Sequence, residues 1–161
     1  MSSAFIRSRR YLIALFAIYC LVMAWLLFGQ RIGFLPDGGY FENLFDKLNL
    51  IPFATISAQF ERVWDDSGLA RHCVINLVGN VITFLPFGLL MPSIWKKLAS
   101  VLRFVLCMSA LIVLIELIQL FTLLGSLDID DYILNIIGAL IGFYINRAVC
   151  VIIKKIKSDG R

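Results

Sequence analysis

The chain has 161 residues, of which 60% are hydrophobic and 16% are charged, and its net charge at pH 7 is +4. Its mean hydropathy is +0.88. A soluble domain is about half apolar and about a quarter charged, and a domain of this size cannot bury so large an apolar excess. The composition therefore excludes a soluble globular enzyme and a disordered chain, and it predicts an integral membrane protein.

Four apolar stretches are each close to the roughly 20 residues that a helix needs to cross the hydrocarbon core of a bilayer. They cover residues 11–28, 74–95, 104–124 and 132–153, and one long connection covers residues 29–73. We therefore expect an all-α integral membrane protein. Its four spans are predicted to form a transmembrane helix bundle within a single domain, residues 1–161.

Basic residues gather before the first span, between the second and third spans, and after the fourth: Arg7, Arg9, Arg10, Lys96, Lys97, Arg103, Lys154, Lys155, Lys157 and Arg161. Asp159 is the one acid on that side, whereas the other side carries four basic residues and nine acids. The positive-inside rule then predicts that both termini are cytoplasmic. Because the positive charge lies at the membrane edges, we expect a lipid bilayer as partner and no nucleic acid.

The connection between the first two spans contains a segment with an apolar face. Phe53, Ile56, Phe60 and Val63 recur at helical spacing, and Trp64 beside them suits the membrane interface. This pattern predicts a short helix that lies on the outer leaflet. A helix packed over the outer ends of the spans would show the same pattern, and the sequence does not separate the two.

Polar residues within three spans are predicted to lie at a similar depth. They are Asn76, Asn80, Glu116, Gln119 and Asn135, with Asp128, Asp130 and Asp131 just outside the fourth span. At 1.5 Å per residue, Asn80 lies roughly 9 Å below the outer end of its span and Glu116 roughly 12 Å below its own. Polar groups that face lipid are costly, so these side chains should face one another inside the bundle.

This cluster predicts a ligand-binding site near the outer face, formed by Asn76, Asn80, Glu116, Gln119, Asp128, Asp131 and Asn135. Each residue also has a structural interpretation. The amides can hydrogen-bond between helices, Asp128 can be the N-cap of the fourth helix, and Asp130 and Asp131 suit its first turn. Carboxylates can also bind Ca²⁺ or Mg²⁺, but this spacing matches no defined metal loop. We therefore expect no metal site and no cofactor.

Glu116 is the sharpest functional signal, because an ionisable residue within a span is a functional hypothesis by default. It can exchange protons, hydrogen-bond a ligand, or serve as a neutral carboxyl bonded to Asn80 or Gln119. Glu116 and Asp131 are the candidate catalytic residues if the protein is an enzyme. Against catalysis, no serine, histidine or cysteine nucleophile occurs in a recognisable constellation.

The fourth span carries a face of small residues, Gly138, Ala139 and Gly142. A small-xxx-small pattern lets two helices approach closely in a membrane. The partner can be another helix of this chain, and a homo-oligomer is equally compatible with the pattern.

Several runs together resemble the VanZ-like family. They are Asn49-Leu-Ile-Pro-Phe53, Asn76-x3-Asn80-x3-Phe84-x-Pro86-x-Gly88, Glu116-x-x-Gln119, and Asp128-Ile-Asp-Asp131-x3-Asn135-x-x-Gly138-x3-Gly142. Their order and spacing agree over about residues 10–150. Many family members carry an arginine before the acidic turn, where this chain has Ser126.

The resemblance implies a bacterial inner- or plasma-membrane protein, and it implies a connection with low-level resistance to teicoplanin, a lipid-bearing glycopeptide. We therefore expect a protein of the outer leaflet that binds a lipid-linked cell-wall precursor or a lipoglycopeptide. One alternative is an intramembrane hydrolase or transferase that uses Glu116 and Asp131 on a lipid-linked substrate. The other is a structural partner of a membrane complex.

Overall fold

A computed structural model describes residues 3–29, 39–65 and 67–159 of the chain. Six α-helices make up most of these residues: α1 (Ser3–Phe28), α2 (Tyr40–Asp46), α3 (Ala54–Asp65), α4 (Ser67–Ile94), α5 (Val101–Phe121) and α6 (Ile129–Asp159). A 3-10 helix, η2 (Lys96–Ala99), joins α4 to α5, and two short strands, β1 (Leu48–Asn49) and β2 (Leu127–Asp128), precede α3 and α6.

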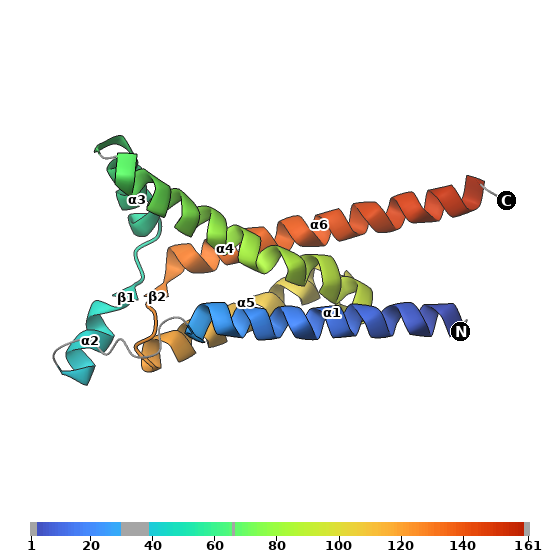
Figure 1. The fold of residues 1–161 in the computed structure, drawn as a ribbon, viewed down its shortest axis with the longest axis horizontal. Coiled ribbons are helices and arrows are strands. Elements are labelled where there is room, and N and C mark those ends of the chain that lie inside the picture. The colour runs from blue at the N-terminus through green and yellow to red at the C-terminus, as the bar shows by residue number, and fades with distance from the viewer. Residues whose placement is uncertain (1–2, 30–38, 66, 160–161) are drawn as a thin grey trace.

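Within the described residues, four helices are long and apolar enough to cross a membrane. Their candidate spans are Arg9–Phe28, Val74–Ile94, Val101–Phe121 and Ile129–Asp159. The prediction of an all-α membrane protein with four spans is therefore confirmed. The N-terminal end of α1 and the C-terminal end of α6 lie at one end of the molecule, and α2 and α3 lie at the other (Figure 1).

Helices α4 and α6 form the closest helix pair. A Cβ added at Gly138 or Gly142 would overlap the carbonyl oxygen of Val81 or Leu85 on α4. Gly88 on α4 has the reciprocal relation to α6, because a Cβ there would overlap the carbonyl oxygen of Ala139. The small face of the fourth span thus packs against α4 of the same chain, as one of its two predicted uses required.

An apolar core fills the middle of the bundle. Its buried members are Met23, Phe84, Phe87, Met91, Phe104, Met108, Ile112, Ala139 and Phe143. Phe87 meets the rings of Phe16 and Tyr19 edge to face, at centroid distances of 5.6 and 5.4 Å. These ring contacts attach α1 to α4, since such pairs add attraction beyond the burial of their surface.

The end opposite the termini is covered by α2, β1 and α3 (Figure 1). Strand β1 pairs in parallel with β2, with Leu48 opposite Leu127 and Asn49 opposite Asp128. This pairing holds the long connection against the start of α6. The sequence analysis did not predict it, and it did not predict α2 either.

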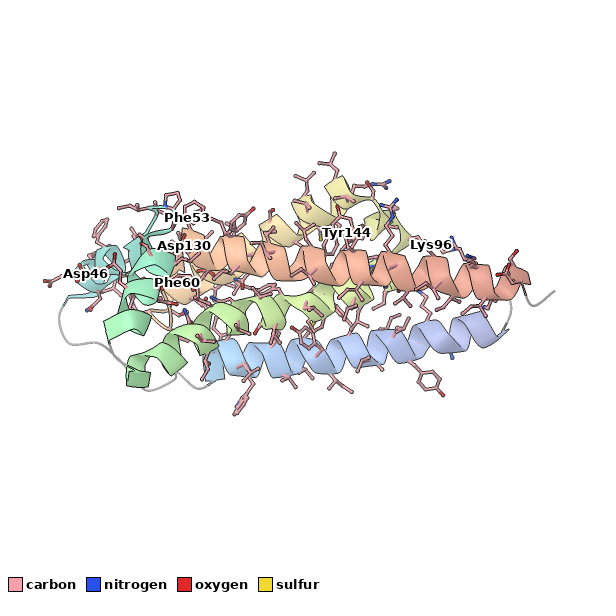
Figure 2. All side chains as sticks on the ribbon, turned by 90° about the horizontal axis from the view of Figure 1, so that it is seen from above. Asp46, Phe53, Phe60, Lys96, Asp130 and Tyr144 are labelled. Carbon is pink, nitrogen blue, oxygen red and sulfur yellow. The ribbon has the colours of Figure 1, made fainter. Side chains whose placement is uncertain are left out.

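The short helix predicted within the long connection is present as α3. Ile56 and Phe60 of α3 line an apolar groove together with Leu77, Val78, Val81 and Leu134 of α4 and α6. The side chains of Phe53 and Phe60 nevertheless remain 61% and 56% exposed, near Asp130 at this end of the molecule (Figure 2). Helix α3 thus packs beside the N-terminal part of α4 and still presents aromatic surface.

Candidate functional site

A polar pocket of about 200 Å³ lies among five helices at the end of the bundle opposite the termini. Its lining residues are Leu27, Thr55, Asn76, Asn80, Thr83, Phe84, Ile115, Glu116, Gln119, Ser126, Asp128, Asp131 and Asn135. All seven residues that the sequence analysis proposed as ligand-binding are among them. The structure therefore brings these residues together, from α4, α5, α6 and the turn before α6.

The pocket ends against the apolar core. Phe84 lines the pocket and is 2% exposed, and its ring stacks on Phe87 at a centroid distance of 5.5 Å. Deeper toward the termini the core continues with Phe104, Met108 and Ile112. The polar chemistry of the bundle is thus concentrated at one end, which favours a binding site over a path through the membrane.

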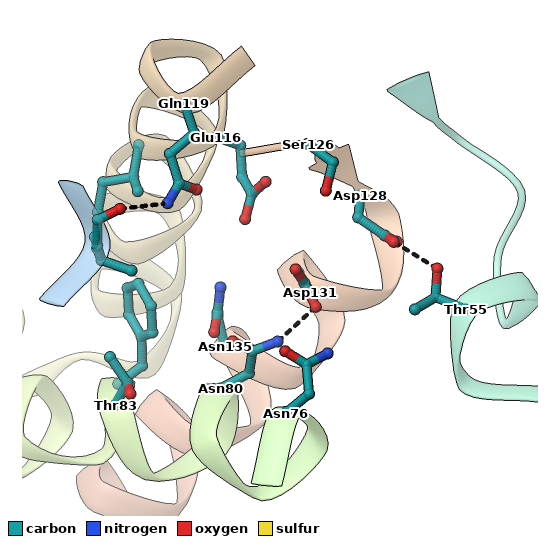
Figure 3. A pocket seen from close by; sticks show the side chains of 13 residues that line it. Thr55, Asn76, Asn80, Thr83, Glu116, Gln119, Ser126, Asp128, Asp131 and Asn135 are labelled. Atoms are coloured by element: carbon teal, nitrogen blue, oxygen red, sulfur yellow. Dashed lines mark hydrogen bonds between the residues drawn. The ribbon is translucent and has the colours of Figure 1, made fainter. Parts of the chain in front are cut away.

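Glu116 and Asp131 point into the same space from opposite walls of the pocket (Figure 3). Glu116 comes from α5 and is 6% exposed. Asp131 comes from the first turn of α6, and Asn80 Nδ2 of α4 donates a hydrogen bond to Asp131 Oδ1. The Asn80 amide thereby fixes the Asp131 carboxyl between α4 and α6.

Asp128 has a structural task as well as a place in the pocket wall. Its Oδ1 accepts the backbone N–H of Asp130 at 2.8 Å, which is the contact of an N-cap on α6. Its Oδ2 accepts hydrogen bonds from the Thr55 hydroxyl and, at 3.2 Å, from Asn49 Nδ2. The N-cap interpretation of Asp128 is thus confirmed, and the same carboxylate joins α6 to the connection between α1 and α4.

Asp130 does not line the pocket, and its side chain is 0% exposed. Its Oδ1 accepts the backbone N–H of Phe53 at 2.6 Å, and its Oδ2 accepts the backbone N–H of Ile56 at 3.0 Å. The first N–H groups of a helix have no partner within that helix. Asp130 supplies such partners to α3 from the first turn of α6, a role that the sequence analysis missed.

Two amide side chains of the pocket, Gln119 and Asn135, differ in their hydrogen bonding. Gln119 Nε2 donates to the carbonyl of Leu27 at 3.4 Å, near the end of α1, so Gln119 acts between helices as the structural interpretation required. Asn135 is only 5% exposed, and its Oδ1 has no hydrogen-bond partner among the described residues. A buried acceptor without a partner is costly, and a ligand donor in the pocket would satisfy it.

The electrostatics of the pocket favour ligands that donate hydrogen bonds or carry positive charge. Three carboxyls line it, from Glu116, Asp128 and Asp131, and no Lys, Arg or His occurs among the described lining residues. Carboxylates are acceptors only, whereas hydroxyls and amides can do both. Within the described residues, no group of three or more His, Cys, Asp or Glu side chains could hold a metal ion.

Sequence reasoning missed three polar residues of the pocket: Thr55, Thr83 and Ser126. Thr83 follows Asn80 by three residues, so its place on the same helix face was readable from spacing. Thr55 and Ser126 carry no such signal. They reach the pocket because α3 and the turn before α6 are held together through Asp128 and the β1–β2 pair.

Residues 16–152 match the VanZ/LLP1 family. The chain is similar to Protein VanZ of Enterococcus faecium, with 31% identity over 129 residues that cover 80% of this chain and 68% of that protein. No solved structure matches.

Proposed function

Because the chain belongs to the VanZ/LLP1 family, we propose that it is a cell-membrane protein of bacteria that acts at the outer leaflet. Its polar pocket takes the head of a lipid-linked cell-wall precursor or of a lipid-bearing glycopeptide such as teicoplanin. By holding that molecule, the protein contributes to resistance. The observation that carries the proposal is the polar pocket, with Glu116, Asp131 and Asn135 directed into it.

The proposed orientation rests on charge. Both termini and the connection η2, with Lys96 and Lys97, belong to the basic side of the chain. Lys96 lies toward the end that carries the termini, whereas Asp130 and Phe53 lie at the other end (Figure 2). The positive-inside rule then makes the end with the termini cytoplasmic. The pocket accordingly lies on the side of the outer leaflet, where cell-wall precursors and glycopeptides are found.

The pocket chemistry agrees with such ligands. Sugar hydroxyls, amides and amines all donate hydrogen bonds, and the pocket offers the carboxyls of Glu116 and Asp131 and the unbonded Oδ1 of Asn135 as acceptors. A hydrogen bond to a charged acceptor contributes about 1.5–3 kcal/mol. Two or three such bonds suffice to orient a polar head whose lipid tail stays in the bilayer.

The test is direct binding of fluorescent teicoplanin to the purified protein in lipid nanodiscs. Glu116→Gln and Asp131→Asn should each raise the Kd about tenfold or more, since losing a charged acceptor removes about 1.5–3 kcal/mol. Asp46→Asn is the matched control, because Asp46 is an exposed carboxyl on α2 outside the pocket. Equal affinity of all four proteins would contradict the proposal.

The convergence of Glu116 and Asp131 (Figure 3) supports a second candidate, an intramembrane hydrolase or transferase. Two carboxyls in one pocket can act as general acid and general base on a lipid-linked substrate. Purified protein incubated with lipid-linked cell-wall precursors should then release a product, and Glu116→Gln should abolish the release. Complete recovery of the precursors across pH and added divalent metals would exclude this candidate.

A further inference from the structure

A second cavity adjoins the polar pocket and shares two of its residues. It measures about 190 Å³ and is lined by Val113, Glu116, Leu127, Asp128, Ile129 and Tyr132. Glu116 and Asp128 line both cavities, so these two side chains form the boundary between them. The remaining four lining residues of the second cavity are apolar or aromatic. A polar chamber and an apolar chamber thus meet at two carboxyls.

The apolar chamber lies between α5 and α6, which a hydrogen bond links beside it. Ser109 Oγ and Tyr132 OH lie 2.9 Å apart, and their hydrogen bond links the two helices one turn deeper than Val113. Val113 itself is 45% exposed on a membrane span, so it faces the lipid. The chamber is therefore open to the membrane beside the outer ends of α5 and α6.

The side chains of the polar chamber indicate which chemical group a ligand bound there would carry. Carboxyl oxygens from α5 and α6 converge there, and the buried Oδ1 of Asn135 lacks a hydrogen-bond partner among the described residues. An ammonium group has three donors and no acceptor, and it forms charge-assisted bonds that outweigh neutral ones. Burial of that charge is tolerable because carboxylates pair with it.

We propose that the site admits an amine-bearing lipid sideways from the outer leaflet, between α5 and α6. The ammonium head occupies the polar chamber, and the first part of an acyl chain lies in the apolar chamber against Val113, Ile129 and Tyr132. This proposal rests on the proposed function, and it adds the class of ligand and the route by which it arrives. It requires both chambers, whereas binding of a soluble head group would require the polar one alone.

The test titrates the purified protein in detergent micelles by native mass spectrometry with three probes. Phosphatidylethanolamine carries an amine and two chains, phosphatidylglycerol carries chains without an amine, and phosphoethanolamine carries an amine without chains. Phosphatidylethanolamine should bind about tenfold or more tighter than either of the others, because each lacks one contact worth about 1.4 kcal/mol or more. Equal binding of phosphatidylglycerol would overturn the ammonium head, and equal binding of phosphoethanolamine would overturn the role of the apolar chamber.

The route is tested by filling the apolar chamber. Val113→Trp should weaken phosphatidylethanolamine about tenfold, a loss of about 1.4 kcal/mol. Leu114→Trp is the matched control and should bind as the unmodified protein does, because Leu114 is 54% exposed and lies outside both chambers. Val113→Phe gives the same test with a smaller ring if the tryptophan variant does not fold. Unchanged binding by a folded Val113 variant would overturn the lateral route.

The same proteins separate this proposal from the proposed function. If Val113→Trp binds phosphatidylethanolamine normally while Glu116→Gln still loses teicoplanin, the lateral route fails and the outer binding site stands. If Glu116→Gln leaves both phosphatidylethanolamine and teicoplanin unaffected, the polar pocket is not a binding site and both proposals fail.

Discussion

Asp130 illustrates how a single buried carboxyl can organise the end of this molecule that lies opposite the termini. It sits in the first turn of α6, where a negative charge interacts favourably with the helix dipole. Both of its oxygens also accept backbone N–H groups at the start of α3. Phe53, one of these partners, has φ at 65°, a left-handed conformation that is uncommon for a bulky residue. The bond to Asp130 holds Phe53 in that conformation.

We predict that Asp130→Ala destabilises the protein by about 3 kcal/mol, because two hydrogen bonds to a charged group are lost and a buried side chain is truncated. Asp46→Ala should change stability by less than about 0.5 kcal/mol, since substitutions at exposed positions rarely do more. Thermal unfolding in detergent, followed by circular dichroism, measures both. A midpoint for Asp130→Ala equal to that of Asp46→Ala would contradict the assigned role.

Two asparagines of α6 provide a contrast between binding and stability. Asn146 Nδ2 donates to the carbonyl of Leu89 and to the Ser93 hydroxyl, both at 2.6 Å, whereas Asn135 Oδ1 is buried without a partner among the described residues. We predict that Asn146→Leu destabilises by about 1–3 kcal/mol, since it removes two hydrogen bonds between partly buried groups. Asn135→Leu should leave stability unchanged or raise it, because it removes an unsatisfied acceptor.

The two variants should rank oppositely in ligand binding. Asn135→Leu should lose affinity for teicoplanin in nanodiscs, and folded Asn146→Leu should retain it, because only Asn135 lines the pocket. Thermal unfolding and the nanodisc assay together make the comparison. A strongly destabilised Asn135→Leu would make that side chain structural, against the present interpretation.

At the residue scale, the sequence was informative wherever spacing along one helix determined the outcome. Asn76 and Asn80 share a face of α4, and the pocket contains both of them. The partners of Asp130 lie 74 and 77 residues away in the chain and are backbone groups. No side-chain pattern encodes such a contact, so it became visible only with the tertiary structure.

At the scale of elements, the crossing of α4 and α6 depends on glycine. We predict that Gly138→Ala destabilises by about 1–3 kcal/mol, because overpacking a close contact forces the backbones apart. Gly79→Ala is the matched control, since a Cβ there meets nothing within 4 Å. Alanine at a free helical position should stabilise by about 0.5–1 kcal/mol. Thermal midpoints that moved in the same direction would refute this account of the crossing.

The sequence predicted that the fourth span packs closely against another helix, but it did not predict which helix. Gly138 and Gly142 form a recognisable small face, which predicts close packing without naming the partner helix. The partner is α4, where Gly88 makes room for the backbone of α6. The β1–β2 pair was not predictable, because two-residue strands have no periodicity and the pairing joins Asn49 to Asp128 across the chain.

At the scale of the whole molecule, charge predicts which end faces the cytoplasm. We predict that a membrane-impermeant maleimide labels Asp46→Cys in intact cells, in a background with its four cysteines replaced by serine. Lys157→Cys, near the C-terminal end of α6, should react only after the membrane is permeabilised. Labelling of Lys157→Cys in intact cells would reverse the orientation and place the pocket at the inner leaflet.

The membrane class followed from composition, and the number of spans followed from the lengths and positions of the apolar stretches. A helix needs about 20 apolar residues to cross the hydrocarbon core, and that core offers no hydrogen-bond partner to backbone groups outside a helix or a closed sheet. The helix ends did not follow as closely. Helix α4 begins at Ser67 and α6 at Ile129, both before the apolar stretches, since a helix can continue past the membrane once its polar ends find partners.

The central claim is the proposal that the polar pocket at the end opposite the termini gives the protein its function. The most direct test expresses the chain in a susceptible Gram-positive host and measures growth inhibition by teicoplanin and by vancomycin. The unmodified protein, Glu116→Gln, Asp131→Asn and Asp46→Asn are compared at matched membrane abundance. We predict protection that is selective for teicoplanin, lost in the two pocket variants and kept in Asp46→Asn. Protection that persists in both pocket variants would contradict the account.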